Sequence, residues 1–388
     1  MKIAHVVNLV DAAGTYGGPL RVALNQLGEL QARGHSVVLL GGAPDRSGGR
    51  GAEEFQGVPT TRFTSAALLP RPGFAGRWAP GLHAHLLRHA RRFDVVHVHL
   101  SRDLTTLPAA ALLARLRVPY VVQTHGMINP SGGLLAKPLD AVLTRPVLRR
   151  ARAVLHLTAT ERHDLDAVLR GAPWEAVELP NGVPSPAANV VSAGGSPEVL
   201  FLSRLHARKR PLLFLAAARL LADQGVRARF TMVGPDEGML PEVMAALKDL
   251  PAGVDAGYEG ALPMSGSVAR IARARVFVLP SLDEPFPMVV LEAMSVGVPV
   301  VCTRSCGLAG PIEAAGAGMV VPDGDPEAIA RAVGRLIEDP ALARRLGCAG
   351  VRLVRERFNA RVVADRLEQV YRQAMGVPSP VAGLVRPG

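Results

Sequence analysis

Two glutamates in the second half of the chain, Glu284 and Glu292, are separated by seven residues. A paired acid and base that act on one bond lie less than about 10 Å apart. If both glutamates were on one helix, they would lie about 12 Å apart along its axis, at about 1.5 Å per residue. We therefore expect them to hold two different parts of one elongated ligand.

The residues around the two glutamates place them on different elements. The apolar run at residues 276–279 predicts a strand, and Glu284 follows in the loop that leaves it. Pro287 suits the first position of a helix, which puts Glu292 inside that helix. The free backbone N–H groups of the first helical turn would form a binding site for phosphate.

A basic loop, Arg204 with Arg208, Lys209 and Arg210, follows the first predicted strand of the second half. Lysine is rare elsewhere in this chain, and we interpret the loop as a clamp for a diphosphate. Taken alone, the loop is better explained as a solvated helix start. We favour the diphosphate clamp because Glu284 follows another predicted strand of the same half, so both loops are expected at the same edge of the sheet.

Two glycine turns also follow predicted strands of the second half, at residues 232–238 (MVGPDEG) and 258–262 (YEGAL). They could bring the backbone near Gly234 and Leu262 close to a nucleobase. Each turn could equally be an ordinary strand exit.

A glycine loop with Gly14, Gly17 and Gly18 follows the first strand of the chain. It reads GTYGGP, which is not the G-x-G-x-x-G order of dinucleotide-binding loops. Hydride transfer is therefore disfavoured. Close approach of a phosphate or a sugar stays open, beside a purely structural role.

Histidines stand near the ends of two predicted strands. His125 lies just beyond a strand end in QTHGM, on the side where ligand-binding loops are expected. His97 and His99 alternate in DVVHVHL, so they point to one face of a strand. No third metal ligand is evident, and we favour packing over metal binding for this pair. We find no Ser-His-Asp triad, P-loop or carboxylate-rich magnesium site.

Strand-like and helical segments alternate along almost the whole chain. This alternation predicts the α/β class, with parallel sheets covered by helices on both faces. The predicted strands are residues 3–7, 36–40, 94–99, 120–123, 153–157 and 176–179 in the first half, and 198–202, 229–233, 256–259, 276–279, 299–302 and 318–321 in the second.

A stretch rich in Ala, Gly, Ser and Pro at residues 184–197 predicts a linker between two domains. We place the domains at residues 1–184 and 185–375, and expect the Pro-rich tail at 376–388 to be disordered. Because ligands bind outside the carboxyl ends of parallel strands, the two domains should face each other across a cleft.

The composition describes a soluble protein. The 388 residues are 48% hydrophobic and only 4% aromatic. The start lacks the long apolar region of a signal peptide, and no apolar run is long enough to span a membrane. Three cysteines without metal-ligand spacing are expected to be reduced. These features predict a cytoplasmic protein.

The net charge of +11 is unevenly distributed, since residues 1–180 hold 21 Lys or Arg against 13 Asp or Glu. With few aromatic residues and no recognition motif, nucleic acid is not expected as a partner. Two interpretations stay open for the basic half. One is peripheral contact with an anionic membrane surface at the inner face of the cell membrane, through a short amphipathic helix at residues 85–91; the other is a solvated basic surface.

Taken together, these residues resemble the retaining glycosyltransferases of family 4, which have the GT-B architecture of two Rossmann-like domains. The resemblance extends over nearly the whole chain. The segments that carry it are YGGPLRVALNQLGELQARGHSV, THGM, LPNGVP, LSRLHARKRPL and the E-x7-E segment. It implies that the last helix, at residues 360–375, returns to the first domain.

The resemblance also implies the roles of the candidate residues. Arg204 and Lys209 would bind the donor diphosphate, Glu292 the ribose, and Glu284 the transferred sugar near its reacting carbon. The residues implied in catalysis are Glu284, His125, Arg204 and Lys209, with His125 lining the sugar and acceptor site. The residues implied in donor binding are Gly17, Gly18, Arg204, Lys209, Gly234, Leu262, Phe286, Met288, Val289 and Glu292.

One position departs from the family. Many members have Gly after the Phe of this loop, whereas here Phe286 precedes Pro287, which has no N–H. Backbone contacts to sugar or phosphate would then fall to Met288 and Val289.

The expected function is a metal-independent, retaining transfer of a hexosyl-type sugar without a cofactor. The donor would be a UDP- or GDP-linked sugar, and the acceptor a glycan or a lipid-linked molecule in cell-envelope or exopolysaccharide synthesis. Two alternatives are a sugar-nucleotide epimerase of similar architecture and a non-catalytic subunit that binds sugar nucleotides. The sequence does not indicate the sugar, the base, the acceptor or the linkage.

Overall fold

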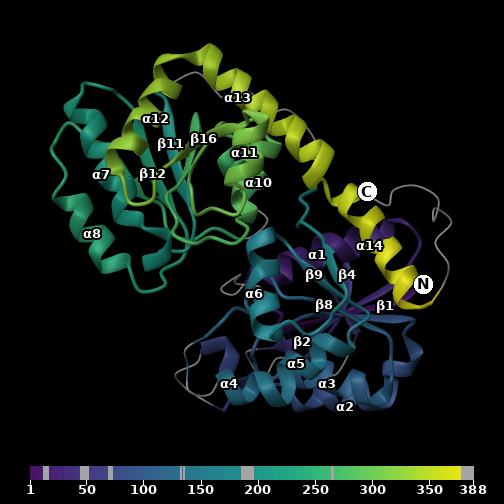
Figure 1. Ribbon diagram of the computed structural model, residues 1–388. Coiled ribbons are helices and arrows are strands. Elements are labelled where there is room, and N and C mark those ends of the chain that lie inside the picture. Colours follow the sequence, from purple (N-terminus) through teal and green to yellow (C-terminus); the bar gives the residue numbers. More distant parts are fainter. Residues whose placement is uncertain are drawn as a thin grey trace. The chain divides into compact units, whose positions relative to one another are not determined.

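The computed structural model describes residues 1–11, 17–43, 52–68, 73–131, 133, 136–184, 196–263 and 266–376. The chain divides into two compact units (Figure 1). Unit 1 comprises Met1–Gly182 and Ala360–Gly388, and unit 2 comprises Val183–Asn359, so the chain passes between the units twice. Most of the predicted linker, residues 185–195, and the tail at 377–388 lie outside the described residues.

Unit 1 is built on an eight-stranded sheet. Its strands, in spatial order, are β10 (Ala176–Glu178), β9 (Ala153–His156), β8 (Tyr120–Gln123), β7 (Val95–His99), β1 (Lys2–Leu9), β2 (Ser36–Ala43), β4 (Val58–Thr64) and β3 (Ala52–Phe55). All neighbours pair in parallel except β3 and β4. A separate antiparallel pair joins β5 (Ala66–Ala67) and β6 (Arg77–Trp78).

The six strands predicted for the first half are present, with ends that differ by up to three residues. Strands β3 to β6 were not predicted. Strands β3 and β4 carry charged residues and Pro59, and β5 and β6 have two residues each, so none shows the apolar run of a buried parallel strand.

Helices cover both faces of the unit 1 sheet. They are α1 (Gly17–Ala32), α2 (Pro80–His89), α3 (Thr106–Leu116), α4 (Ala136–Leu139), a π-helical turn (Asp140–Thr144), α5 (Arg145–Arg150), α6 (Ala159–Leu169) and α14 (Ala360–Ala374). Side chains of α2, α3, α5 and α6 pack in the core on one face, and those of α1 and α14 pack on the other (Figure 1).

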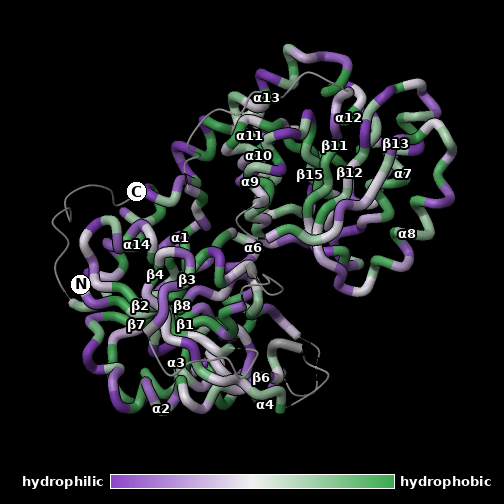
Figure 2. The backbone as a smooth tube through the Cα atoms, turned by 180° about the vertical axis from the view of Figure 1, so that it is seen from behind, coloured by the Kyte–Doolittle hydropathy of each residue, from purple (hydrophilic) through white to green (hydrophobic). Residues whose placement is uncertain are grey.

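Alternation along the strands assigns each side chain to one of these two faces. In β1, Ala4 and Val6 pack toward α2 and α3, whereas Ile3 and Val7 pack toward α1 and α14. His5 therefore lies on the face covered by α1 and α14, in a sheet whose strands are mainly hydrophobic (Figure 2).

Unit 2 contains a six-stranded, all-parallel sheet. The spatial order is β13 (Asp255–Tyr258), β12 (Arg229–Val233), β11 (Glu198–Leu202), β14 (Val276–Leu279), β15 (Val300–Thr303) and β16 (Gly318–Val321). The six strands predicted for the second half are confirmed. From β11 the chain first adds strands on one side and then returns to add β14 beside β11 on the other. The carboxyl ends of β11 and β14 therefore flank a topological switch point, where open α/β sheets bind ligands.

The helices of unit 2 are α7 (Pro211–Asp223), α8 (Leu240–Lys248), α9 (Ser267–Ile271), α10 (Met288–Ser295), α11 (Ala309–Ala315), α12 (Pro326–Glu338) and α13 (Pro340–Leu353), which continues into a π-helical turn at Val354–Phe358. The last helix of the chain, α14, is part of unit 1, as the resemblance implied. In the described part of the chain, no helix combines the length and the apolar character needed to cross a bilayer.

Candidate functional site

The loops that leave β11 and β14 are joined at the switch point of unit 2. Nζ of Lys209 forms an ion pair with Oε2 of Glu284, and the two side chains are only 11% and 15% exposed. The backbone N–H of Leu282 donates to the carbonyl of Arg208 at 2.8 Å. The structure thus brings together Lys209 and Glu284, which the sequence implicated separately.

Arg204 makes a different contact from Lys209. Its Nη1 lies 2.5 Å from Oε1 of Glu237, which is in the loop after β12, and its side chain is 43% exposed. The guanidinium of Arg208 instead donates to the carbonyl of Asp283 at 2.5 Å. The sequence analysis did not identify Glu237 as the partner of Arg204. The only sequence signal was the acidic residue in the MVGPDEG turn, which follows the strand next to β11.

Helix α10 follows the loop of Glu284. It begins at Met288, with Pro287 as its N-cap rather than as its first helical residue. Met288 and Val289 therefore form the first turn and are partly exposed. Phe286 is buried, and its ring meets that of Phe358 edge-on, with centroids 5.8 Å apart.

Glu292 is inside α10, as predicted, but it is only 2% exposed. Its Oε2 accepts a hydrogen bond from Oγ of Ser267 at 3.0 Å. The carboxylate is thus held within the protein, and its contact with a ribose stays a prediction.

Gly234 occupies a backbone position that requires glycine. Its φ is +142°, and a Cβ atom there would lie 2.0 Å from the carbonyl oxygen of Ser203. Its N–H donates to the carbonyl of Gly260 at 2.8 Å, which links the exits of β12 and β13. Close packing is a sufficient reason for this glycine, so contacts of Gly234 and Leu262 with a donor stay predictions.

In unit 1, His125 lies in a tight loop after β8. Both His125 (φ +52°) and Gly126 (φ +72°) have left-handed backbone conformations, which are uncommon for a residue other than glycine. The carboxylate of Glu161 holds this loop. It accepts from Oγ1 of Thr124 at 2.6 Å and from the N–H of Gly126 at 2.5 Å.

Glu161 belongs to the start of α6. Thr158 is the N-cap of this helix, with Oγ1 accepting from the N–H of Glu161 at 3.2 Å. This is a T-x-x-E capping pattern, which the sequence offered as a signal for the helix start. The same carboxylate also accepts from the N–H of Leu157 at 2.6 Å.

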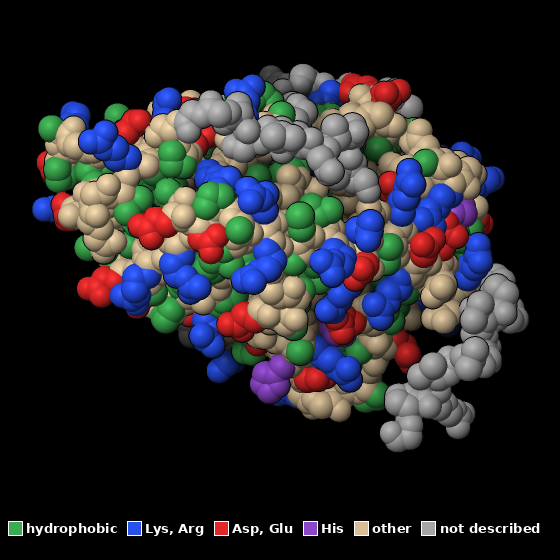
Figure 3. Space-filling model, turned by 90° about the horizontal axis from the view of Figure 1, so that it is seen from above, with side chains coloured by type: hydrophobic (Ala, Val, Ile, Leu, Met, Phe, Trp, Pro, Cys, Tyr) green, Lys and Arg blue, Asp and Glu red, His purple; other side chains and the backbone are tan. Residues whose placement is uncertain are grey.

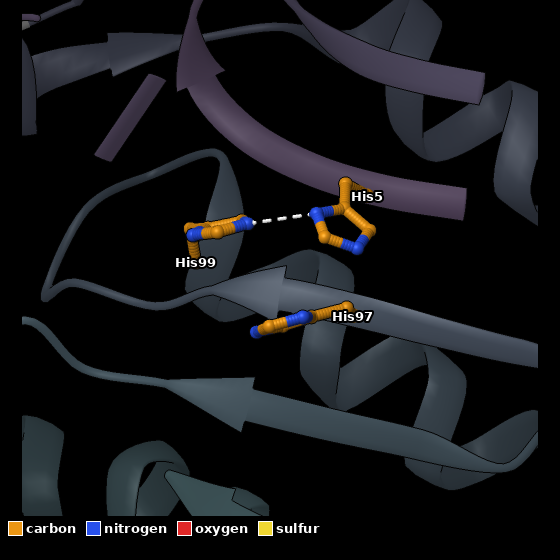
Figure 4. Close-up of side chains that lie close together, drawn as sticks. All are labelled: His5, His97 and His99. Atoms are coloured by element: carbon orange, nitrogen blue, oxygen red, sulfur yellow. Dashed lines mark hydrogen bonds between the residues drawn. The ribbon is translucent and has the colours of Figure 1, made fainter. Parts of the chain in front are cut away.

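The ring of His125 is the end of a chain of hydrogen-bonded side chains. Its Nε2 lies 2.8 Å from Nδ1 of His99, and Nε2 of His99 lies 3.0 Å from Nδ1 of His5 (Figure 4). The hydroxyl of Tyr371, on α14, lies 2.8 Å from Nε2 of His5 and 2.7 Å from Nδ1 of His97. We call these five residues the histidine chain.

His5 and His97 are direct neighbours in the parallel pairing of β1 and β7. His97 and His99 do share a face, as predicted, but His5 was missed as their neighbour. Ligand atoms of His5, His97 and His99 all lie within 4.8 Å of one another, which is compatible with a metal ion. The hydrogen bonds of the histidine chain already use both nitrogens of His5 and of His99, which favours the non-metal interpretation.

Burial controls the charge of the histidine chain. It lowers the pKa of His125 to about 3. Burial and neighbouring histidines also lower the pKa values of His5, His97 and His99 well below 6.5. The four rings are therefore neutral near pH 7. Burial raises the pKa of Tyr371, so its hydroxyl keeps its proton.

The glycine loop of unit 1 is described only in part. Gly17 and Gly18 are the first residues of α1, and Gly14 lies outside the described residues. A Cβ atom on Gly18 would meet no described atom within 4 Å, so packing does not require a glycine there. Its approach to a phosphate stays a prediction.

Comparison with known proteins identifies both halves of the chain. Residues 17–182 match the family of glycosyl transferase 4-like domains, and residues 187–352 match glycosyl transferases group 1. Among curated proteins, the D-inositol 3-phosphate glycosyltransferase of Kineococcus radiotolerans is 30% identical over 360 residues, which cover 81% of each chain. The glycogen synthase of Mycobacterium tuberculosis is 27% identical over 377 residues, 88% of this chain and 87% of that one.

Solved structures show the same fold. Sucrose-phosphate synthase from Thermosynechococcus elongatus superposes with a TM-score of 0.74 at 20% identity, covering 97% of this chain and 99% of the other. Anabaena HepE in complex with UDP-glucose has a TM-score of 0.69 at 18% identity, with 95% and 98% covered. These relationships confirm the resemblance found in the sequence, and the chain belongs to the family 4-type glycosyltransferases with the GT-B fold.

Proposed function

We propose that this glycosyltransferase moves a hexosyl-type sugar from a UDP- or GDP-linked donor to its acceptor with retention of configuration. The observation that carries the proposal is the pairing of Lys209 with Glu284 at the switch point between β11 and β14. A cation for the diphosphate and a carboxylate for the sugar are thereby held side by side. The UDP-glucose complex of HepE, a neighbour of the same fold, supports a sugar nucleotide as the donor.

The chemistry requires that negative charge be stabilised on the departing nucleotide. Lys209, Arg204 and the N-terminus of α10 would carry out this role around the diphosphate. The ion pairs with Glu284 and Glu237 keep the two cations in place before the donor binds. Because these cations supply positive charge at the diphosphate, we propose that transfer needs no metal ion.

The retaining step is proposed to proceed on the face of the sugar from which the nucleotide leaves. The bond from the anomeric carbon to the phosphate oxygen breaks, the bond to the acceptor oxygen forms, and the acceptor proton passes to a phosphate oxygen. We expect His125 not to take this proton, because a pKa lowered to about 3 makes its neutral ring a weak base. It would instead contact the sugar or the acceptor as a neutral hydrogen-bonding group.

We propose a glycan or lipid-linked acceptor and a cytoplasmic role in cell-envelope or exopolysaccharide synthesis. The names of the relatives, which include an inositol phosphate glycosyltransferase and a glycogen synthase, are compatible with several acceptor classes. They do not favour an epimerase or a non-catalytic subunit, since each names a transfer or polymerising enzyme.

The first test is turnover of a panel of UDP- and GDP-sugars, with and without acceptors, by the wild type and by Glu284→Gln. We expect one donor class to be consumed, a product with the donor's anomeric configuration, and slower transfer by Glu284→Gln with nearly unchanged nucleotide affinity. Donor turnover that yields only an epimeric sugar nucleotide would replace the proposal with epimerisation. Binding without transfer or hydrolysis would indicate a non-catalytic subunit.

A second prediction concerns the membrane. Leu87 on α2 is 58% exposed beside the exposed Arg88, Arg91 and Arg92, whereas Leu86, also within the predicted amphipathic helix, is buried in the core. On the face shown in Figure 3, by contrast, Lys and Arg are interspersed with Asp and Glu. We expect the protein to float with anionic vesicles at low salt and to be released at high salt.

Variants distinguish membrane binding by this surface of α2 from a general attraction between a basic protein and anionic vesicles. Replacing Arg88, Arg91 and Arg92 by Gln should abolish flotation. Leu212→Ser, which changes an exposed leucine of unit 2, should leave it unchanged. If the wild type stays with the soluble fraction at low salt, the basic half is a solvated surface.

A further inference from the structure

The histidine chain connects the candidate acceptor-side residue His125 to the last helix of the protein. We propose that the buried end of the histidine chain, His97 with Tyr371, acts through His5 and His99 to fix which ring nitrogen of His125 carries the proton. This inference rests on the proposed function only where it assigns the proton of His125 a role in binding the sugar or the acceptor. The hydrogen bonds themselves are features of unit 1 alone.

The protons in the chain are strongly constrained. A neutral imidazole has one N–H and one bare nitrogen, so His5 and His99 must each donate to one neighbour and accept from the other. The hydroxyl of Tyr371 has one proton, which it can give to either His5 or His97. When every bond has one donor and one acceptor, all of the bonds run in the same direction along the chain.

The direction of the hydrogen bonds is set at His97, the end of the chain opposite His125. Nε2 of His97 is buried and has no hydrogen-bond partner among the described residues. Among buried backbone groups, an N–H without a partner is rarer than a carbonyl that lacks one, and we extend this preference to the ring nitrogens. His97 therefore leaves Nε2 bare and donates from Nδ1 to the hydroxyl oxygen of Tyr371, at 2.7 Å.

Every later bond follows from this choice. Tyr371 donates to Nε2 of His5, and Nδ1 of His5 donates to Nε2 of His99. Nδ1 of His99 then donates to Nε2 of His125, at 2.8 Å. The proton of His125 is consequently on Nδ1, the nitrogen outside the chain, and His125 presents a hydrogen-bond donor there.

The backbone of His125 is fixed independently of its ring. Glu161 holds both flanking residues, Thr124 and Gly126, and so maintains the left-handed conformation between them. The hydrogen bonds of Glu161 fix the position of the His125 ring, and the histidine chain determines whether its Nδ1 carries a proton. A donor at this position suits a sugar or acceptor oxygen and would not accept a proton from an acceptor hydroxyl.

Nuclear magnetic resonance of protein labelled with ¹⁵N in its histidines tests this assignment. Bare and protonated ring nitrogens have well-separated ¹⁵N shifts, and His125→Gln identifies the signals of His125 among the 11 histidines. We expect the wild type to show a protonated Nδ1 and a bare Nε2 at His125. The opposite tautomer in the wild type would overturn the proposal, whatever the variants do.

Tyr371→Phe removes the hydroxyl that joins His97 to His5, so Nε2 of His5 becomes the buried end of a shorter chain. By the same preference that nitrogen stays bare, and we expect His125 to keep its proton on Nδ1. Tyr120→Phe, which removes another buried tyrosine hydroxyl of unit 1, is the matched control for the loss of such a hydroxyl. A shift of the His125 proton to Nε2 in a folded Tyr371→Phe variant would contradict the proposal.

Two further measurements separate this inference from the proposed function and from a metal site. We expect His125→Gln to slow transfer about tenfold with little change in KM for the donor. Unchanged transfer by His125→Gln, together with a protonated Nδ1 of His125 in the wild type, would uphold the chain and remove His125 from the reaction. One equivalent of transition metal in the purified protein would overturn the chain, because a metal needs nitrogens that these hydrogen bonds occupy.

Discussion

Unit 1 is expected to lose stability steeply as the pH falls below about 6.5. Four of its histidines, the buried His5, His97 and His99 and the half-buried His125, have pKa values lowered by desolvation, from 6.5 to about 3 in the case of His125. Once unfolded, the same rings would take up protons near pH 6.5. Below that pH the unfolded state binds more protons than the folded state, so acid favours unfolding.

This difference in proton binding determines the direction and the size of the change in unfolding free energy with pH. Stability from these groups is complete above about pH 6.5 and falls with decreasing pH until the folded pKa values are reached. Each group contributes at most about 1.4 kcal/mol per pH unit, so the four groups together cost at most about 6 kcal/mol at pH 5.5. A typical domain has only about 5 to 15 kcal/mol in total. Glu368, whose lowered pKa also stabilises unit 1, acts in a more acidic range.

Denaturant unfolding at pH 7.5 and pH 5.5 measures this effect. Both tryptophans of the chain, Trp78 and Trp174, are in unit 1, so tryptophan fluorescence reports on this unit alone. His163→Gln, which changes an exposed histidine of α6, should keep the full pH dependence. His97→Gln should reduce it by at most about a quarter, because His85 and His156 of unit 1 also have lowered pKa values. Equal unfolding free energies at the two pH values would contradict the neutral, buried state of the rings.

Lys209→Ala is expected to slow glycosyl transfer by about two orders of magnitude. Removing one stabiliser of developing negative charge typically costs about 3 kcal/mol of barrier. Lys209 is well placed for such an effect, because its side chain is only 11% exposed and little screened by water. Lys248→Ala removes the same charge from an exposed position of the same unit and should leave transfer unchanged.

The ion pair makes a second control necessary. Lys209→Ala leaves the partly buried Glu284 without its partner, which could destabilise the loop itself. The double variant with Glu284→Gln removes the uncompensated charge, so it should recover the melting temperature but not the transfer rate. Transfer near the wild-type rate by Lys209→Ala would remove Lys209 from the diphosphate site.

The parallel sheets could be predicted from the sequence because their strands are short apolar runs bounded by turns. Val276–Leu279, for example, is completely buried, and its boundaries were predicted correctly. Strand β4 was missed because it contains Pro59 and Arg62 and lies near the edge of its sheet, where apolar side chains are not required on both faces.

The candidate site was predictable where the chemistry follows strand ends. Lys209 and Glu284 each follow a strand, and the parallel order places those ends side by side. The histidine chain was not predictable in this way. His5 and Tyr371 are 366 residues apart, and neither the pairing of β1 with β7 nor the docking of α14 follows from local pattern.

The late return of α14 to unit 1 affects how the protein can be made. Val363, Leu367, Val370 and Tyr371 of this helix complete the core on one face of a sheet whose first strand is at residue 2. A ribosome therefore synthesises every residue of unit 2 before it reaches the last segment of unit 1. The core of unit 1 can therefore be completed only after α14 has been synthesised, and a premature stop after Asn359 would expose to water the histidines that α14 covers.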